Sequence, residues 1–197
     1  MTIPDLEFWW HCLAEGTRVT LADGGTVPVE HVDNTMRVRT RDGGSIGVEA
    51  TTRGLHAGEV LRLSTEDHHS VVLTAGHPVV TPDGLRRAVD LAVGDHVLTQ
   101  DGVTQVTERV PVPSTAVFAN LKLINDDDRA RGLAGSVGTF IANGIAVGDF
   151  LSMTALHKQN ARSLGYMLPR LPEKYHTDYA SMLADIARDN VHYGGNL

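Results

Sequence analysis

Short apolar runs separated by turn signals dominate the chain from about residue 16 to residue 149. Within these runs apolar residues recur at every second position, and Asp-Gly, Gly-Gly or Asn-Gly pairs interrupt them at intervals of roughly ten residues. This alternation predicts half-buried strands joined by tight hairpins, as in a sandwich or barrel-like β fold. The predicted strands cover residues 17–21, 26–29, 60–63, 70–74, 78–81, 95–99, 104–107 and 117–124.

The last predicted strand pair spans residues 140–147, and Asn143 and Gly144 supply the positive φ angles of its turn. Before it, residues 126–132 are charged and end in glycine, so we expect a solvated loop there. After residue 149 the spacing becomes helical over 151–164, and two prolines then break the pattern. A further apolar stripe, expected to pack as a helix against the β domain, comprises Tyr175, Tyr179, Met182, Leu183 and Ile186.

The bulk composition excludes several classes of function. A chain of 197 residues with 42% hydrophobic content fits one medium soluble domain with an appendix. The formal net charge is -7 and the basic residues do not cluster, so we expect no nucleic-acid partner. No apolar run approaches the ~20 residues that span a bilayer. The N-terminus also lacks the features of a secretion signal, so we expect a cytoplasmic protein without a membrane partner.

A single cysteine, Cys12, rules out an internal disulfide and fits a reducing compartment. A lone cysteine is more often an inert core residue than a nucleophile. The segments around Cys12 and downstream of it decide between these two interpretations.

Three segments occur in a fixed order. Residues 12–30 contain Cys12, a Gly-Thr turn into a strand, an Asp-Gly turn and a second strand. Residues 71–85 contain Thr74 and, three positions later, His77 followed by proline, with a Gly-Asp pair downstream in residues 91–98. Residues 139–149 form the closing strand pair.

Together these segments resemble the Hint superfamily, the self-processing domains shared by inteins and hedgehog C-terminal domains, and in particular its bacterial intein-like type. The resemblance covers about seven-tenths of the chain. It implies a mainly β, horseshoe-shaped fold with a C-terminal α-helical extension. The implied domains are an N-terminal flank at 1–11, a Hint domain at 12–149 and the extension at 150–197. It further implies Cys12, Thr74 and His77 as the catalytic residues of an autocatalytic cleavage between His11 and Cys12.

The chemistry can also be stated from the residues. The Cys12 sulfur would attack the His11 carbonyl and convert the amide into a thioester, which requires thiolate character. The departing amine needs a proton, and an imidazole with its usual pKa of about 6.5 can supply it, a role that suits His77. Thr74 would hydrogen-bond the scissile carbonyl or help twist the amide. Water, a thiol or an amine would then accept the acyl group, which is the chain's own N-terminal segment, in a single turnover.

The closing segment departs from the family pattern. The family usually ends in His-Asn, whereas Gly148 and Asp149 stand here, followed by Phe150 in place of Ser, Thr or Cys. Gly138 replaces a common upstream histidine, and Asn120 replaces a common aspartate. These differences argue against splicing and leave the thioester-forming half of the reaction.

Two other hypotheses stay open. The helical tail would suit a Cys/His thiol enzyme acting in trans on another molecule, and the degenerate C-terminal motif would suit an inactive binding scaffold. We expect no cofactor. His68 and His69 with His77 could suggest a metal, but no cysteine or carboxylate spacing completes a tetrahedral set, so we expect no metal site.

Overall fold

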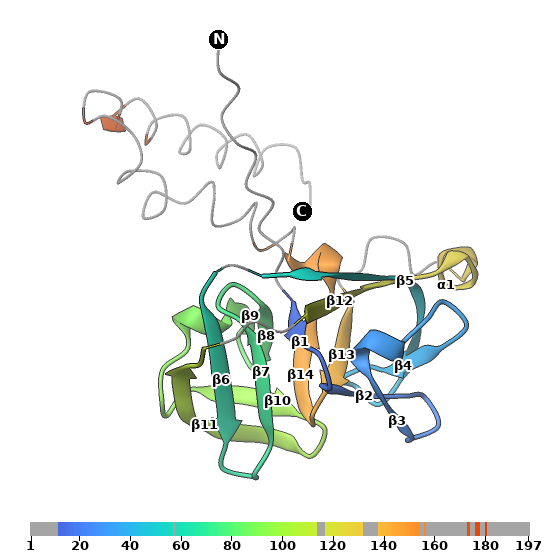
Figure 1. Ribbon diagram of the computed structural model, residues 1–197, viewed down its shortest axis with the longest axis horizontal. Coiled ribbons are helices and arrows are strands. Elements are labelled where there is room, and N and C mark those ends of the chain that lie inside the picture. Colours follow the sequence, from blue (N-terminus) through green and yellow to red (C-terminus); the bar gives the residue numbers. More distant parts are fainter. Residues whose placement is uncertain are drawn as a thin grey trace. The chain divides into compact units, whose positions relative to one another are not determined.

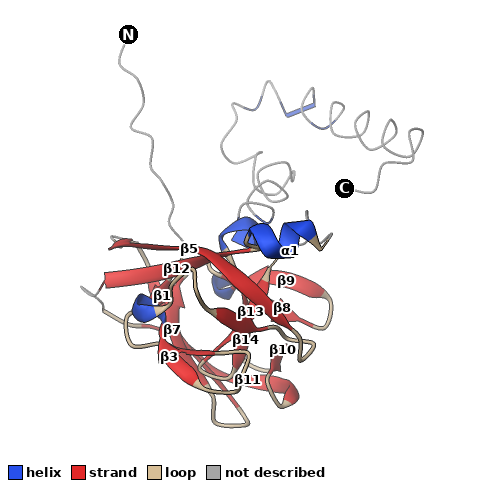
Figure 2. Ribbon diagram, turned by 90° about the vertical axis from the view of Figure 1, so that its right-hand side faces the viewer, coloured by secondary structure: helices blue, strands red, loops and turns tan. Residues whose placement is uncertain are grey.

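The computed structural model describes residues 12–56, 58–113, 117–131 and 138–153, together with Leu156 and a few residues beyond it. The chain divides into two compact units, residues 1–156 and 157–197. Strands make up most of the described part of the first unit (Figures 1 and 2), which confirms the mainly β prediction. In the second unit, helical backbone is described at Glu173, His176, Thr177 and Ala180.

The strands follow one another closely along the first unit, with two short 3-10 turns between them. Their bounds are β1 (Leu13–Ala14), β2 (Arg18–Thr20), β3 (Thr26–Pro28), β4 (Arg37–Arg39), β5 (Ser45–Leu55), β6 (Val60–Thr65), β7 (Ser70–Thr74), β8 (Pro78–Thr81), β9 (Gly84–Arg87), β10 (His96–Thr99), β11 (Gly102–Pro111), β12 (Val117–Leu123), β13 (Thr139–Ala142) and β14 (Ile145–Gly148). The 3-10 turns are η1 (Val29–His31) and η2 (Ala88–Asp90).

The strands form one continuous antiparallel sheet in the order β3-β2-β13-β14-β10-β11-β6-β7-β1-β12-β5-β4, and β8 joins β14 to β9. The short strand β1 lies between β7 and β12, with Leu13 paired to Leu73 on one side and to Ala119 on the other. The start of the domain is therefore inserted between two strands that lie far along the chain (Figure 1).

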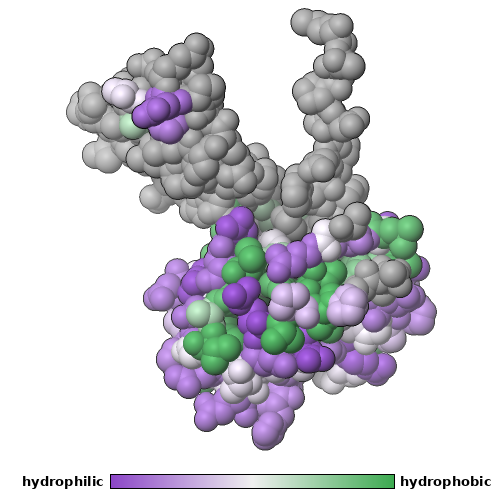
Figure 3. Space-filling model, turned by 60° about the vertical axis from the view of Figure 1, so that its left-hand side comes forward, coloured by the Kyte–Doolittle hydropathy of each residue, from purple (hydrophilic) through white to green (hydrophobic). Residues whose placement is uncertain are grey.

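A large apolar cluster fills the interior of the sheet, with fully buried side chains such as Phe140, Leu63 and Leu121. Cys12, Val60 and Phe118 form a smaller, separate cluster. The surface is mostly polar in the view of Figure 3, with small apolar areas between the polar residues. Among the described residues, the large apolar side chains that remain exposed are Leu55, Val93 and Val103.

The structure confirms the predicted closing hairpin, because β13 and β14 pair around Asn143 and Gly144, which have φ angles of 47° and 84°. The predicted strand list omits β1, β4, β5 and β9, although β5 is the longest strand of the sheet. Its buried residues, 46–48, are consecutive and do not alternate with exposed ones, because β5 bridges β12 and β4. A pattern search at period two therefore overlooks it.

The prediction of a solvated loop at 126–132 is wrong for its first five residues, because Asp126–Ala130 form the helix α1, and Gly132 lies outside the described residues. Asn125 is the N-cap residue, and its side-chain oxygen accepts a hydrogen bond of 3.1 Å from the backbone nitrogen of Asp128. The acidic residues of the first turn also favour the helix, since they lie near the positive end of its dipole.

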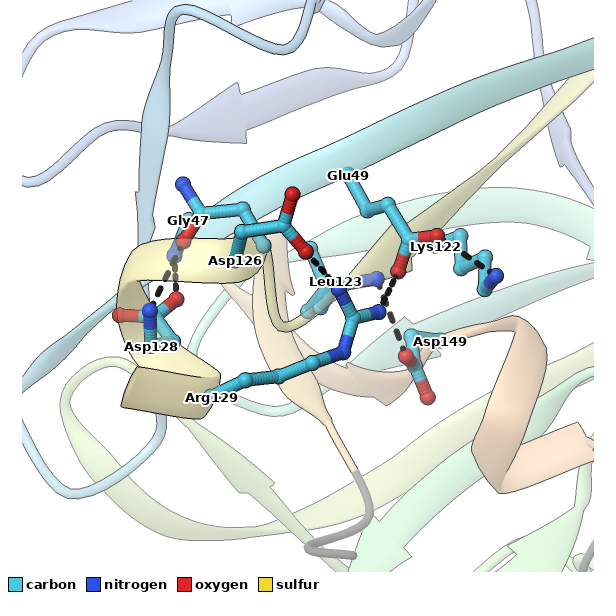
Figure 4. Close-up of polar contacts among 9 residues, drawn as sticks. Gly47, Glu49, Lys122, Leu123, Asp126, Asp128, Arg129 and Asp149 are labelled. Atoms are coloured by element: carbon cyan, nitrogen blue, oxygen red, sulfur yellow. Dashed lines mark hydrogen bonds and ion pairs between the residues drawn. The ribbon is translucent and has the colours of Figure 1, made fainter. Parts of the chain in front are cut away.

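Asp128 attaches α1 to the sheet. Its buried carboxylate accepts hydrogen bonds of 2.6 Å from the Gly47 backbone nitrogen and 2.9 Å from the Arg37 guanidinium. On the other side of the helix, Arg129 donates to Glu49 and to Asp126 (Figure 4). Long-range polar contacts therefore order a segment that looks like a loop in sequence.

Beyond residue 149 the described backbone is helical at 150–153 and at Leu156, as the sequence pattern predicts. The predicted stripe of Tyr175, Tyr179, Met182, Leu183 and Ile186 lies outside the described residues, as do residues 1–11. Of the helices that the structure describes, none has the length and apolar content needed to cross a membrane.

Candidate active site

Cys12 lies at the point where the chain enters the sheet, immediately before β1. Its backbone nitrogen donates a 2.9 Å hydrogen bond to the Thr74 hydroxyl at the end of β7. Its carbonyl oxygen accepts a second hydrogen bond of 2.9 Å, from the Thr74 backbone nitrogen. The two residues are thus joined by a pair of hydrogen bonds, and the Thr74 side chain contacts the nitrogen of the His11–Cys12 peptide bond.

His77 reaches the same place through a turn that begins at Thr74. The His77 backbone nitrogen donates a 2.9 Å hydrogen bond to the Thr74 carbonyl, and the His77 carbonyl accepts one of 3.0 Å from Ala88. The His77 side chain is fully buried. Cys12 and His77 thus each form a hydrogen bond with Thr74 through their backbones, while His11 lies outside the described residues.

The Cys12 side chain packs among apolar groups. It is 4% exposed and shares its cluster with Val60 and Phe118, against which Val72 and Val112 also pack. This burial raises the pKa of the Cys12 thiol to about 12. The sequence chemistry calls for thiolate character, but the resting thiol holds its proton at neutral pH because the apolar cluster cannot stabilise a charge.

Thr74 contacts the scissile bond through the nitrogen of residue 12, which donates to its hydroxyl. The sequence suggests a hydrogen bond from Thr74 to the carbonyl of residue 11 or a role in twisting the amide, and residue 11 lies outside the described residues. Thr74 is fully buried, so its side chain is held in a fixed environment. A hydroxyl at that nitrogen is in the right place to pass a proton to it once the amide loses its planarity.

Asn120 lies on β12 next to Ala119, the residue that pairs with Leu13. Asn120 is buried, and its side-chain oxygen accepts a 2.8 Å hydrogen bond from the Leu121 backbone nitrogen. An amide cannot take up a proton near neutral pH, so this position offers the thiol no base.

A second histidine, His56, borders the Cys12 cluster. Its ring meets the ring of Phe118 edge-on, with 5.7 Å between centroids and 60° between planes. Burial lowers the pKa of His56, against a hydrogen bond that the ring donates to the Glu59 backbone and that acts to raise it, so the neutral ring is favoured. Sequence reasoning missed His56, because no motif includes it and only the packing of Phe118 relates it to Cys12.

The closing segment ends in a helix cap. Asp149 follows β14, and its carboxylate accepts hydrogen bonds of 2.8 Å from the Ser152 backbone nitrogen and 3.2 Å from the Leu123 backbone nitrogen (Figure 4 shows the latter). Burial raises the pKa of Asp149, although the hydrogen bonds that it accepts act in the opposite direction. Asp149 thus caps the helical backbone that begins at Phe150 and ties it to β12.

The two glycines that stand at the family's histidine positions have no room for a side chain. A Cβ at Gly148 would lie 2.6 Å from the Ser152 Cβ and 2.9 Å from the Pro78 Cβ. A Cβ at Gly138 would lie 2.8 Å from a carboxylate oxygen of Asp149. The space next to Asp149 is therefore already occupied.

The histidines that are close in sequence separate in the structure. His69 precedes β7 and His77 follows it, while the His68 side chain is exposed. Among the described residues, one group of side chains has the composition and spacing to hold a metal ion: Asp67, His69 and Asp101. It lies at the opposite end of β7 from Thr74.

Comparison with solved structures identifies the fold. One match is a bacterial intein-like domain from Clostridium thermocellum, with 22% identity and a TM-score of 0.57, covering 70% of this chain and 98% of that one. The gp41-1 intein matches with 13% identity, a TM-score of 0.57 and coverages of 70% and 98%. A DnaB intein from Synechocystis matches with 17% identity, a TM-score of 0.57 and coverages of 71% and 99%.

These likenesses confirm the predicted fold. The first unit has the Hint fold of inteins and intein-like domains. Comparisons with protein-family models and with curated proteins give no match.

Proposed function

We propose that residues 12–149 form an autoprocessing domain in which Cys12 makes an N-to-S acyl shift at the His11–Cys12 bond. The resulting thioester is then cleaved by water or transferred to a thiol or an amine. The observation that carries the proposal is the hydrogen bond from the Cys12 backbone nitrogen to the Thr74 hydroxyl, because that nitrogen is the leaving atom of the reaction.

The step balances as an isomerisation. A bond forms between the Cys12 sulfur and the His11 carbonyl carbon, and the carbon–nitrogen bond of the peptide breaks. The thiol proton ends on the new amine of Cys12. Attack by water on the thioester releases the carboxylic acid of His11 and restores the thiol. The chain itself supplies every atom except those of the acceptor.

Thr74 and His77 have distinct roles in this scheme. His77 removes the thiol proton and returns it to the leaving nitrogen, and the Thr74 hydroxyl carries the last transfer because it already contacts that nitrogen. The two hydrogen bonds between Cys12 and Thr74 hold the backbone of Cys12, and with it the position from which the sulfur attacks. Holding the reacting groups in this way replaces a bimolecular encounter.

The buried thiol makes the reaction slow. Because burial raises the pKa of Cys12 to about 12, almost all of the thiol is protonated at pH 7. Burial also argues against the thiol enzyme acting in trans, since a large substrate cannot contact a side chain that is 4% exposed. Attack on the adjacent carbonyl needs no such access.

The arrangement at Asp149 supports N-terminal cleavage without splicing. The Asp149 carboxylate caps a helix that begins at the next residue, Phe150. The backbone on both sides of the bond after Asp149 is therefore held in place by regular structure. The helical extension then stays attached to the domain after cleavage.

The raised pKa of Cys12 favours one competing function, an inactive scaffold that keeps the fold. Alkylation of the thiol does not separate the two functions, because burial slows it in both. Release of the N-terminal segment does separate them.

A mass-spectrometric time course on the purified full chain tests the proposal. We expect loss of residues 1–11, acceleration by dithiothreitol, and an unchanged mass for Cys12→Ala under the same conditions. An intact mass after days with thiol would favour the scaffold, and equal cleavage in Cys12→Ala would point to a contaminating protease.

A further inference from the structure

Three hairpin turns meet at the end of the fold where β7 begins. The backbone nitrogen of Gln100, in the β10–β11 turn, donates a 2.8 Å hydrogen bond to the carbonyl of Gly144, in the β13–β14 turn. The side-chain nitrogen of Asn143 donates a 2.9 Å hydrogen bond to the carbonyl of Ser70, at the β6–β7 turn. Segments that are far apart in sequence are thereby held next to one another.

These turns bring together one imidazole and two carboxylates. Nε2 of His69 lies 3.0 Å from Oδ2 of Asp101 and 3.7 Å from Oδ2 of Asp67. One ligand atom from each residue lies within 4.8 Å of both others. Zinc bonds of about 2.0–2.2 Å in a tetrahedral set place ligand atoms roughly 3.3–3.5 Å apart, so small side-chain rotations suffice to bind a single ion.

Asp67 is held in place by two hydroxyl groups. Its two carboxylate oxygens accept hydrogen bonds of 2.5 Å from the Thr65 hydroxyl and 2.9 Å from the Thr99 hydroxyl. Each oxygen keeps a lone pair for a further bond. Metal ligands are commonly oriented by such neighbouring hydrogen bonds.

The His69 ring is also fixed by its surroundings. It lies against Gly144, where a Cβ would come within 2.2 Å of its Nδ1 atom. Only glycine leaves room for the ring at this turn, and the ring then presents Nε2 to the two carboxylates. The position of the imidazole therefore depends on a residue from a third hairpin.

We propose that Asp67, His69 and Asp101 form a binding site for a divalent transition-metal ion, with zinc as the reference ion. One nitrogen and two carboxylate oxygens are a donor set that zinc accepts, with water in the fourth position. The ion would balance two carboxylates that face a single imidazole, and it would link the β6–β7 and β10–β11 turns.

The site is structural in its effect. The five residues of β7 separate it from Thr74 by roughly 15 Å, so the ion takes no part in the chemistry at Cys12. An ion that binds only the folded chain stabilises that fold by mass action. The proposal is therefore independent of whether the His11–Cys12 bond is cleaved.

A competing arrangement is possible for Asp101. Its exposed side chain also lines a surface pocket of about 390 Å³ with Arg39 and Arg41. An Asp101 carboxylate that turns toward these arginines would leave His69 and Asp67 as an ordinary polar pair. The experiment must therefore distinguish zinc binding at the three residues from zinc binding elsewhere.

The test uses the full chain carrying Cys12→Ala, which keeps it intact and removes the thiol as a zinc ligand. After dialysis against a chelator, zinc chloride is added during calorimetric titration and thermal unfolding. We expect His69→Gln and Asp101→Asn each to lose one equivalent of zinc, or to bind it at least tenfold more weakly, and to lose the zinc-dependent rise in melting temperature.

Two matched controls should keep both responses. His68→Asn changes the neighbouring histidine to a residue that tolerates its φ of 66°. Asp83→Asn changes the corresponding exposed aspartate of another Asp-Gly turn, between β8 and β9. The proposal is overturned if His69→Gln and Asp101→Asn retain the zinc stoichiometry and the melting shift, or if the parent chain shows no zinc-dependent shift.

Discussion

The hydroxyl of Thr74 lies 2.9 Å from the backbone nitrogen of Cys12, so a side chain at the end of β7 contacts the leaving atom of the proposed acyl shift. Thr74→Val keeps the shape of the side chain and removes the hydroxyl. We expect thiol-induced cleavage to slow by roughly a hundredfold, the loss typical of one oriented polar group at a reacting centre.

Thr74→Ser is the matched control for that prediction, since it keeps the hydroxyl, and it should cleave within a few-fold of the parent rate. Cleavage rates come from the mass-spectrometric time course at saturating dithiothreitol. Equal rates for Thr74→Val and the parent chain would exclude Thr74 from the reaction.

The single thiol of the chain should resist alkylation in the folded state. A pKa of about 12 for Cys12, against about 8.5 for free cysteine, predicts reaction with iodoacetamide about a thousandfold more slowly than free cysteine at pH 8. The rate should rise about tenfold per pH unit and reach the free value in strong denaturant. Rapid labelling of the folded chain at pH 7 would show that the thiol is activated.

The same thiol makes the stability depend on pH. The folded chain keeps the Cys12 proton up to about pH 12, whereas the unfolded chain loses it near the usual cysteine pKa of about 8.5. Because the unfolded state binds fewer protons above that pH, the free energy of unfolding should fall by about 1.4 kcal/mol per pH unit.

This loss is measured as the difference between the parent chain and Cys12→Ser, which lacks the titrating group. Urea unfolding is measured at pH 8, 9.5 and 10.5. As the pH rises through this range, the free energy of unfolding of the parent chain should fall relative to that of Cys12→Ser. Parallel stability curves through pH 10.5 would show that the thiol is not buried in solution.

Asp149 is predicted to matter for stability through its cap. Asp149→Ala removes the acceptor for the backbone nitrogens of Ser152 and Leu123, so we expect a loss of about 1–3 kcal/mol in the free energy of unfolding. Asp126→Ala, at a fully exposed carboxylate of α1, should have a clearly smaller effect. Chemical denaturation gives the free energy of unfolding of both variants. Equal losses would contradict a stabilising role for the Asp149 cap.

Local features were predictable from the sequence where they depend on neighbouring residues. Asn143 and Gly144 adopt positive φ because the two-residue turn requires it, and the order of the Cys12 and Thr74 segments led directly to the Hint fold. The environment of the Cys12 thiol was not predictable. Its pKa depends on Val60 and Phe118, which reach it only through the pairing of distant strands.

The same limit explains α1 and the proposed metal site. Asp128 looks like a solvated charge until Arg37, 91 positions away, is brought to it. The sequence suggested His68, His69 and His77 as a possible metal group, yet β7 separates His69 from His77. Asp101 joins His69 only because the β6–β7 and β10–β11 turns meet, and no spacing rule contains that information.

Gly148 is predicted to tolerate no larger side chain. A Cβ there would lie 2.6 Å from the Ser152 Cβ, so Gly148→Ala should lower the free energy of unfolding by about 1–3 kcal/mol through overpacking. Gly54→Ala, in a strand with open space around the new methyl group, is the matched control and should be near neutral. Thermal and urea unfolding measure both, and a Gly148→Ala chain as stable as Gly54→Ala would contradict the packing.

The filled spaces at Gly138 and Gly148 impose an order on any mutational path toward a splicing-competent ending. A histidine introduced first at either position meets Asp149, Ser152 or Pro78, so its effect depends on substitutions that must already be present. Engineering therefore has to begin with smaller side chains at Ser152 and Asp149. Histidines can be introduced at positions 138 and 148 only after that space is free.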